Sequence, residues 1–161
     1  MRAVVQRVNW AEVRVEDRCL GRIGTGILLY AGFERGDGEA ELSFLCDKVV
    51  NLRIFPDDGG RMNRSLLDVD GAVLSISQFT LPSRIRNGRR PDFGCAMEPE
   101  AAREMYRELN RRLERQVKLA CGEFGAHMRV CCENDGPVTF IIERNPRGMD
   151  PQGQQPDNFA T

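Results

Sequence analysis

The segment Ile27-Leu28-Leu29-Tyr30-Ala31-Gly32 is a continuous apolar run and gives the clearest indication of the fold class. A strand with both faces covered shows no alternation of polar and apolar residues, so this run is typical of a central strand in a layered α/β domain. Gly24-Thr25-Gly26 precedes the run, but the third glycine of a dinucleotide-binding loop is missing and no helix follows directly. The segment therefore predicts a covered strand and not a dinucleotide site.

Helical and strand patterns alternate on the C-terminal side of this run. Residues 37–52 carry apolar residues at helical spacing, and Asp37 is the expected cap of that helix. Residues 72–81 form the longest predicted strand, which a proline ends. A second helix is expected to begin at Pro99 and to carry an apolar stripe as far as Leu113.

Further strands are expected near both ends of the chain. They cover residues 2–8, 11–16, 19–23, 53–55, 124–133 and 138–143. Strand pairs followed by two strand–helix units and closing strands predict an α/β fold, a three-layer sandwich or barrel-like arrangement of sheets with two main helices. One domain is expected over residues 1–143, and residues 144–161, rich in proline, glycine and glutamine, are expected to form a mobile tail.

The composition fits one globular domain. The chain has 161 residues, of which 41% are hydrophobic and 29% are charged. Its 23 basic and 24 acidic side chains leave a net charge of −1, so DNA is not an expected partner and any RNA contact must use a local patch. No apolar run could span a membrane and no signal-peptide core is present, so we expect a cytoplasmic protein with no membrane partner.

The cysteines and the histidine offer little support for cofactor chemistry. The six cysteines include no CxxC pair, so reduced, packed thiols are expected and neither a metal nor a cofactor is predicted. His127 is the single histidine, and its place in the predicted strand 124–133 indicates an outward, surface position. A base paired with a nucleophile is therefore not expected at this residue.

Polar residues interrupt the long predicted strand at Ser77–Leu81. Period-two geometry would place Gln78 and Thr80 on one face, with Ser77 and Phe79 on the other. Backbone N–H groups at such a strand end could bind a ligand and stabilise a carbonyl oxygen that gains charge. The same pattern also fits a strand that simply meets solvent, where threonine is common.

The segment 134–139 contains a second candidate, Gly136-Pro137. A Gly–Pro turn is rigid, X–Pro bonds adopt the cis form at modest cost, and such a turn could hold two carbonyl oxygens in a fixed direction. An ordinary hairpin turn is the alternative.

A basic loop follows the predicted strand 72–81. Four arginines fall within positions 84 to 90: Arg84, Arg86, Arg89 and Arg90. Their planar guanidinium groups suit phosphate, although a solvated loop paired with local acids would have the same composition.

Together these segments resemble the D-aminoacyl-tRNA deacylase family, from Met1 to about Glu143. The matching segments are residues 3–8, 53–55, 77–81, 90–93 and 134–139. A single tetrapeptide would be weak evidence for a family, but Ser-Gln-Phe-Thr and Gly-Pro-Val-Thr together, in this order and within a chain of this length, form a specific signature.

The resemblance implies a homodimeric enzyme that hydrolyses the ester between a D-amino acid, or glycine, and the acceptor end of tRNA. By that match, the pocket around the terminal adenosine and the aminoacyl group is lined by Ser77, Gln78, Phe79 and Thr80. Further wall residues would be Ala96, Met97 and Phe124. Gly136 and Pro137 would enter the site of the partner subunit through a cis peptide, bind the substrate amino group and exclude an L side chain.

The chemistry implied by the resemblance needs no protein base, because the family is thought to use the ribose 2′-hydroxyl to help activate water. We then expect the backbone N–H groups near Phe79 and Thr80 to polarise the ester carbonyl. A covalent role for Thr80 stays open. So do two other functions: a non-catalytic dimeric binding module, and a cysteine- or threonine-dependent hydrolase of another ester.

Overall fold

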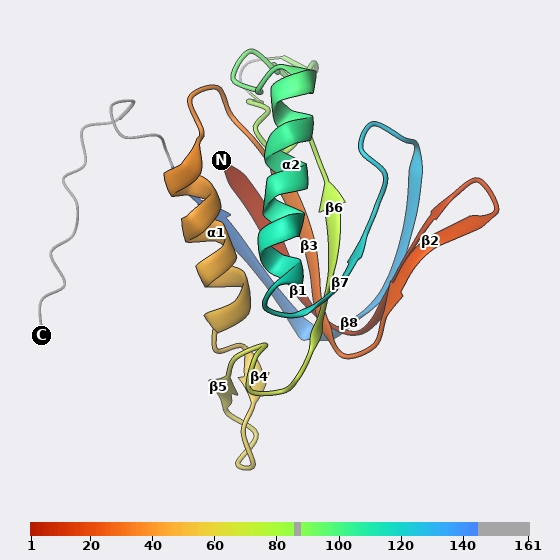
Figure 1. Cartoon of the computed structure of the whole chain (residues 1–161), viewed down its shortest axis with the longest axis vertical. Helices are drawn as coiled ribbons and strands as arrows, with labels where there is room; N and C mark the ends of the chain where they lie inside the picture. Colours follow the sequence, from red (N-terminus) through yellow and green to blue (C-terminus); the bar gives the residue numbers. More distant parts are fainter. Residues whose placement is uncertain (86–87, 145–161) are drawn as a thin grey trace, which may run out of the picture.

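The computed structural model describes residues 1–85 and 88–144, and Figure 1 shows the helices packed against a strongly curved sheet. The elements follow one another as β1 (Arg2–Val15), β2 (Arg18–Ile23), β3 (Gly26–Gly32), α1 (Glu39–Asn51), β4 (Phe55–Pro56), β5 (Met62–Arg64), β6 (Ala72–Ser77), α2 (Pro99–Glu114), β7 (Lys118–Cys121) and β8 (Met128–Glu143). The predicted tail falls almost entirely on residues 145–161, which lie outside the described residues.

The long strand β1 organises the sheet. One edge of β1 pairs antiparallel with β3 and then with β2, while the other edge pairs with β8 along nearly its whole length. The two separate strands predicted here are wrong, because Asn9 and Trp10 continue β1. The side chains of both residues donate hydrogen bonds to the Glu133 carboxylate of β8, at 2.7 and 3.3 Å.

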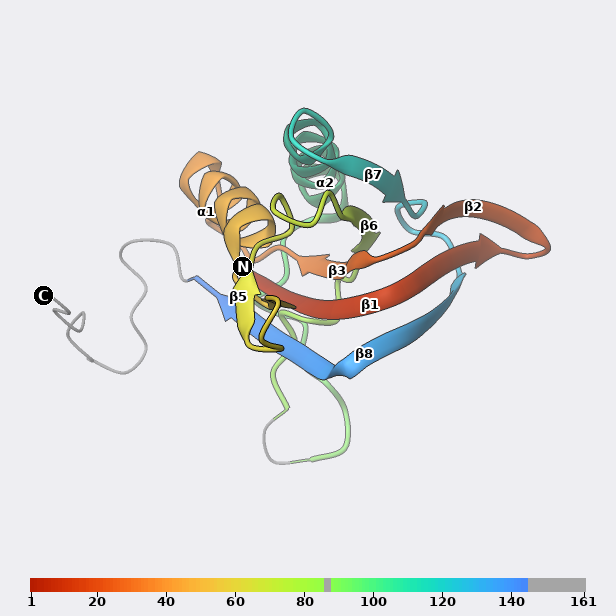
Figure 2. The same cartoon turned by 90° about the horizontal axis from the view of Figure 1, so that it is seen from below.

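Parallel pairing extends the sheet from β3 to β6 and from β6 to β7. The helices α1 and α2 lie in the two connections, and Figure 2 shows both on the same face of the sheet. The curvature brings β7 beside β2, since a Cβ atom at Gly21 would lie 2.9 Å from the Cβ of Ala120. The predicted α/β class, with a barrel-like sheet and two main helices, is confirmed.

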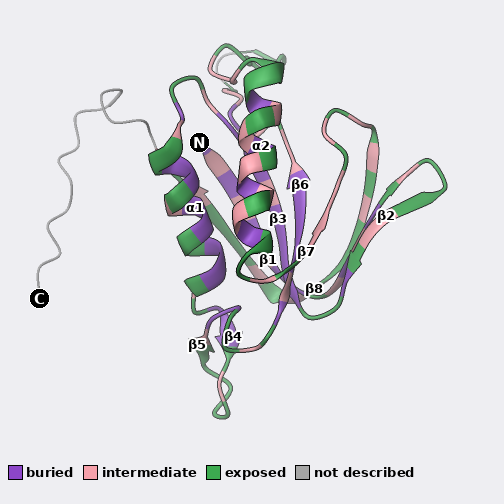
Figure 3. Ribbon diagram, viewed as in Figure 1, coloured by how far each residue is buried: buried purple, intermediate pink, exposed green. Residues whose placement is uncertain are grey.

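The strand β3 contributes to two separate cores, which explains its continuous apolar sequence. Ile27, Leu29 and Ala31 pack on the side of the helices, whereas Leu28 packs on the opposite face of the sheet. All four are buried, and Figure 3 shows the burial concentrated in β3, β6 and the inner faces of the helices. Burial on both faces is what the unbroken run predicts.

The helix starts are partly as predicted. Pro99 is the first residue of α2, as expected from its fixed φ. Asp37 does not cap α1, because its carboxylate accepts hydrogen bonds from the Glu34 N–H and from the N-terminal ammonium. The Glu41 carboxylate instead accepts the N–H of Gly38, the residue before α1. Burial raises the pKa of Asp37 despite these bonds.

Four further predicted strands have different bounds in the structure. The strand predicted at 53–55 is confined to Phe55–Pro56, and the strand predicted at 72–81 ends at Ser77. The two strands predicted near the C-terminal end form a single strand, β8, which begins at Met128 and continues through the residues expected to form a turn.

None of the helices in the described ranges is long and apolar enough to cross a bilayer.

We predict that Gly26→Ala lowers the free energy of unfolding by about 2–3 kcal/mol, the upper part of the usual range for overpacking a closed site. A Cβ atom at Gly26 would overlap the backbone carbonyl of Ala72 in the neighbouring strand, so the β3–β6 pair must separate. Chemical unfolding at fixed protein concentration measures the change. Gly24→Ala is the matched control, because its Cβ atom would project into open space; equal unfolding midpoints for the two variants would contradict the prediction.

Candidate functional site

A cavity of about 630 Å³ opens beside the carboxyl ends of the parallel strands β3 and β6. Its walls come from the last residues of these strands, the segment after β6, residues 93–99, the first turn of α2 and residues 124–130. Ligands of α/β proteins commonly bind beside the carboxyl ends of parallel strands. The cavity is therefore the first candidate for a binding site.

Several residues predicted from the sequence meet in this cavity. Its lining includes Ser77, Gln78, Phe79, Ala96, Met97 and Phe124. These residues come from three separate segments, which the fold brings together. Among the described residues, the lining does not include Thr80, Gly136, Pro137, Arg84, Arg89 or Arg90, and Arg86 lies outside the described residues.

The segment after β6 is a pair of turns and not the end of a strand. The Gln78 N–H donates to the Ala31 carbonyl at 2.8 Å, which is the last backbone hydrogen bond from this segment to β3. Leu81 then donates to the Gln78 carbonyl and Ser83 to the Thr80 carbonyl, at 3.2 and 3.1 Å. The predicted alternation of faces is therefore wrong here. Gln78 and Thr80 are neighbours for a different reason, because the Gln78 side-chain amide donates to the Thr80 hydroxyl at 2.7 Å.

These turns leave two N–H groups available. Among the residues that the structure describes, the amides of Phe79 and Thr80 donate to no acceptor, and both residues are exposed. Two adjacent amide donors beside a cavity can bind a carbonyl oxygen and stabilise the negative charge that it gains during addition. The site thus offers backbone donors where sequence analysis expected them.

The last residue of β3 allows this segment to pack closely. A Cβ atom at Gly32 would lie 2.6 Å from the Gln78 carbonyl oxygen and 2.7 Å from the Cδ of Pro82. Only a residue without a side chain fits that space unless the turns shift. Sequence analysis placed Gly32 in a strand but did not connect it with the site, since the two segments are far apart in the sequence.

Aromatic rings form much of the cavity wall. Phe79 is 66% exposed and Phe93 40% exposed, and their ring centroids are 5.5 Å apart. Phe124 packs against Tyr106 at 6.1 Å, while the Arg103 guanidinium lies 5.0 Å from its ring centroid. Exposed faces of this kind can stack on nucleobases or other planar groups.

Charged and polar groups that sequence analysis missed also line the cavity. Arg35 and Glu98 form an exposed ion pair at 2.8 Å on its rim. His127 lies in the segment before β8 and not inside a strand; it is exposed, as predicted, but it belongs to the cavity lining. The only sequence signal for Arg35 was its position just beyond the apolar run that forms β3.

Gly136 and Pro137 form a bulge in β8. Gln6 of β1 pairs with Thr139 and Val8 with Asn134, so four residues of β8 lie opposite a single residue of β1. The hairpin alternative is therefore wrong, because both arms of the bulge pair with the same strand. The peptide between Gly136 and Pro137 is cis, and both residues are exposed.

Side chains on either side hold this bulge in shape. The Arg7 guanidinium of β1 donates to the Asp135 carbonyl at 3.2 Å and pairs with the Asp135 carboxylate at 2.8 Å. Asn134 closes the base of the bulge, since its side-chain oxygen accepts the Val138 N–H at 2.8 Å. The exposed residues Gly136 and Pro137 are thus carried on a backbone that neighbouring side chains hold in place.

The thiols contribute little to the cavity. No cysteine belongs to its lining in the described part of the chain, and that part holds no cluster of His, Cys, Asp and Glu suited to a metal. Burial raises the pKa of Cys46 and of Cys121 to about 11, so both are protonated at neutral pH. These observations do not favour a cysteine nucleophile.

Comparison with known proteins gives consistent matches. The family described as D-Tyr-tRNA(Tyr) deacylase matches residues 4–143. Relatives named D-aminoacyl-tRNA deacylase from Syntrophomonas wolfei and Pelobacter propionicus are 49% and 50% identical over 144 and 145 residues, which is 89% of this chain and 97% and 100% of theirs.

Two solved structures have the same fold. One, described as c-Myc DNA Unwinding Element Binding Protein, has a TM-score of 0.86 and 38% identity, covering 90% of this chain and 99% of its own. The other, described as a probable eukaryotic D-amino acid tRNA deacylase, has a TM-score of 0.75 at 16% identity, covering 88% and 97%. The second likeness supports the fold alone.

We predict that Asn134→Ala lowers the free energy of unfolding by about 1–2 kcal/mol, because the partly buried Val138 N–H loses its acceptor. The measurement is chemical unfolding under identical conditions. Asn51→Ala is a control of the same chemistry, since Asn51 makes an exposed side-chain bond to Asp47 and should change stability by less than about 0.5 kcal/mol. The prediction fails if the two substitutions cost the same.

Proposed function

The chain belongs to the D-aminoacyl-tRNA deacylase family, and from this we propose that it hydrolyses the ester that joins a D-amino acid to the acceptor end of tRNA. The observation that carries the proposal is the pair of turns after β6, which leaves the Phe79 and Thr80 amides free beside an aromatic cavity. The products are the free D-amino acid and tRNA.

The two amides receive the ester carbonyl oxygen in this mechanism. Water adds to the carbonyl carbon, negative charge develops on the oxygen bound by the Phe79 and Thr80 N–H groups, and the carbon–oxygen bond to the ribose breaks. The ribose 2′-hydroxyl of the substrate helps to activate the water, and the released ribose oxygen takes up a proton. An activated ester needs less acid–base assistance than an amide, so positioning and charge stabilisation suffice.

Chirality is read by main-chain oxygens of a second subunit. In the proposed homodimer, the carbonyl groups of Gly136 and Pro137 enter the partner's cavity, bind the substrate amino group and leave no space for an L side chain. Their exposure in a single chain supports this arrangement, as does their absence from the lining of their own cavity in the described residues. Ile141 on β8 is also a large exposed apolar side chain, and burial in a dimer would remove it from water.

The remaining specificity follows from the same geometry. Glycine has no Cβ atom, so glycyl-tRNA passes the steric filter and is a second substrate. Ala96, Met97 and Phe124 form the wall of the pocket, and the terminal adenosine stacks on its aromatic rings. The proposed contacts to tRNA phosphates are Arg84, Arg89 and Arg90, which do not line the cavity, together with Arg86, which lies outside the described residues. The activity belongs in the cytoplasm, where aminoacyl-tRNA is used.

The decisive experiment compares D-Tyr-tRNA with L-Tyr-tRNA. We expect the D-ester to be cleaved at least about a hundredfold faster, which corresponds to about 2.7 kcal/mol of transition-state free energy. Deacylation is measured by loss of radiolabelled amino acid from tRNA. Equal rates for the two esters would remove the proposed role of Gly136 and Pro137.

The same assay separates the alternative functions. A binding module would cleave neither ester. A cysteine-dependent hydrolase would lose activity after treatment with iodoacetamide, whereas the proposed mechanism keeps its rate within about twofold because no thiol takes part.

Thr80→Ala tests whether the backbone or the hydroxyl of Thr80 acts. We expect the rate to fall less than about tenfold, because the substitution removes one neutral hydrogen bond, that from Gln78, and keeps the backbone N–H. Single-turnover deacylation gives the rate, and Thr80→Ser is the control. A loss above about a thousandfold in a folded Thr80→Ala protein, restored by serine, would identify a covalent nucleophile instead.

A further inference from the structure

Arg2, at the start of β1, contacts the segment that carries the two free amides. Its guanidinium donates from Nη1 to the carbonyl oxygens of Leu81 and Ser83, each at 3.3 Å. We propose that Arg2 is a positioning residue that fixes the turns after β6 and so holds the Phe79 and Thr80 amides in place. This inference rests on the proposed function for its catalytic consequence, but not for the contact itself.

The two carbonyl groups depend on Arg2. Among the described residues, neither the Leu81 nor the Ser83 carbonyl accepts a hydrogen bond from a backbone N–H. The near end of the turns is bonded to β3 through the Gln78 N–H and the Ala31 carbonyl, whereas the bonds from Leu81 to Gln78 and from Ser83 to Thr80 both lie within the segment itself. Arg2 is therefore the polar link that attaches the far end of the turns to the sheet.

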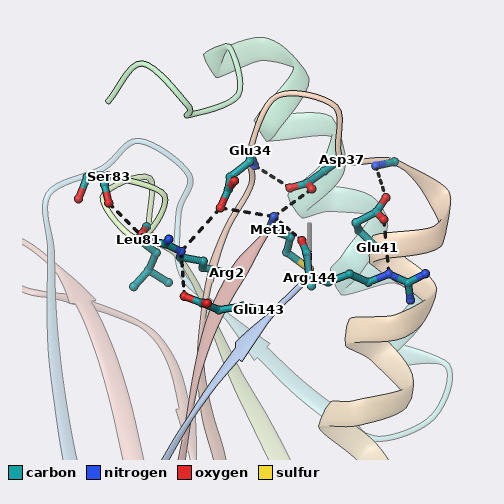
Figure 4. A network of polar contacts seen from close by, with 10 residues as sticks. Met1, Arg2, Glu34, Asp37, Glu41, Leu81, Ser83, Glu143 and Arg144 are labelled. Atoms are coloured by element: carbon teal, nitrogen blue, oxygen red, sulfur yellow. Dashed lines mark hydrogen bonds and ion pairs between the residues drawn. The ribbon is translucent and has the colours of Figure 1, made fainter. Parts of the chain in front are cut away.

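Two carboxylates hold the guanidinium in the orientation that this link requires. Figure 4 shows Arg2 between the turns on one side and Glu34 and Glu143 on the other. Its Nε lies 2.9 Å from the Glu143 carboxylate at the end of β8 and 3.7 Å from that of Glu34. The Arg2 side chain is only 36% exposed, so its contacts are partly shielded from water.

The geometry of the contact favours arginine. A planar guanidinium can donate to two carbonyl groups while a third N–H faces a carboxylate, whereas the ammonium of lysine acts as a single point charge. Without the link, the turns can move relative to the sheet. A displacement of about 1 Å at a catalytic group costs up to about a hundredfold in rate.

The expected kinetic signature follows from where the amides act. They stabilise charge that is present in the transition state and not in the bound ester, so poor positioning lowers kcat and leaves KM nearly unchanged. A direct contact between Arg2 and tRNA would instead raise KM. A purely structural role would lower the melting temperature together with the rate.

The test compares Arg2→Met and Arg2→Lys with Arg14→Met, a control on the same strand whose exposed side chain pairs with Glu12 away from the cavity. We expect Arg2→Met to lower kcat for D-Tyr-tRNA by about 10- to 100-fold with KM within about threefold. Arg2→Lys should fall between Arg2→Met and the wild type. Arg14→Met should match the wild type.

A second measurement, amide hydrogen exchange without substrate, needs no activity. The Leu81 and Ser83 amides should exchange faster in Arg2→Met than in Arg14→Met, at an unchanged melting temperature. Equal exchange in the two variants, a kcat within twofold of the control, or a rise in KM alone would overturn the proposal. Faster exchange at these amides in a protein that does not cleave D-Tyr-tRNA would support the positioning role and overturn the proposed function.

Discussion

The continuous pairing of β1 with β8 on one edge, and with β3 and β2 on the other, is the constraint on which the rest of the molecule depends. Because backbone hydrogen bonds fix the register of three neighbouring strands at once, β1 sets the curvature of the sheet. The curvature brings β7 to β2 and leaves the carboxyl ends of β3 and β6 facing an open cavity. The helices α1 and α2 cover one face of this sheet and complete the larger core there.

The same strand also supports both segments to which a role in the site is proposed. Arg2, at one end of β1, binds the turns after β6, and Arg7, five positions further along, binds the bulge that contains Gly136 and Pro137. In each case a guanidinium donates to backbone carbonyl oxygens of the segment, and among the described residues these oxygens accept no hydrogen bond within the segment itself. A rigid strand is a suitable support, since groups placed on regular elements vary less in position than groups on free loops.

The proposed chemistry uses the main chain where many hydrolases use side chains. In this proposal, the Phe79 and Thr80 amides stabilise charge, while the carbonyl groups of the bulge exclude the wrong stereoisomer. A backbone group moves only if its whole segment moves, so the precision of the site is set by the contacts that hold each segment. Gly32, with no side chain between β3 and the turns, and Asn134, at the base of the bulge, belong to those contacts.

The sequence by itself determined the covered strand at 27–32, the start of α2 at Pro99 and the polar strand end at Ser77, because periodicity and turn residues act over short distances; the other cavity segments, at Ala96, Met97 and Phe124, came only from the family resemblance. It did not reveal that Asn9 and Trp10 continue β1, that Gln78 begins a turn, or that β8 runs through the Gly–Pro bulge. Only the tertiary structure decided these points and placed Arg2 against Leu81. Each of them depends on contacts between residues far apart in the chain, and the free energy of such pairing overrides local preference.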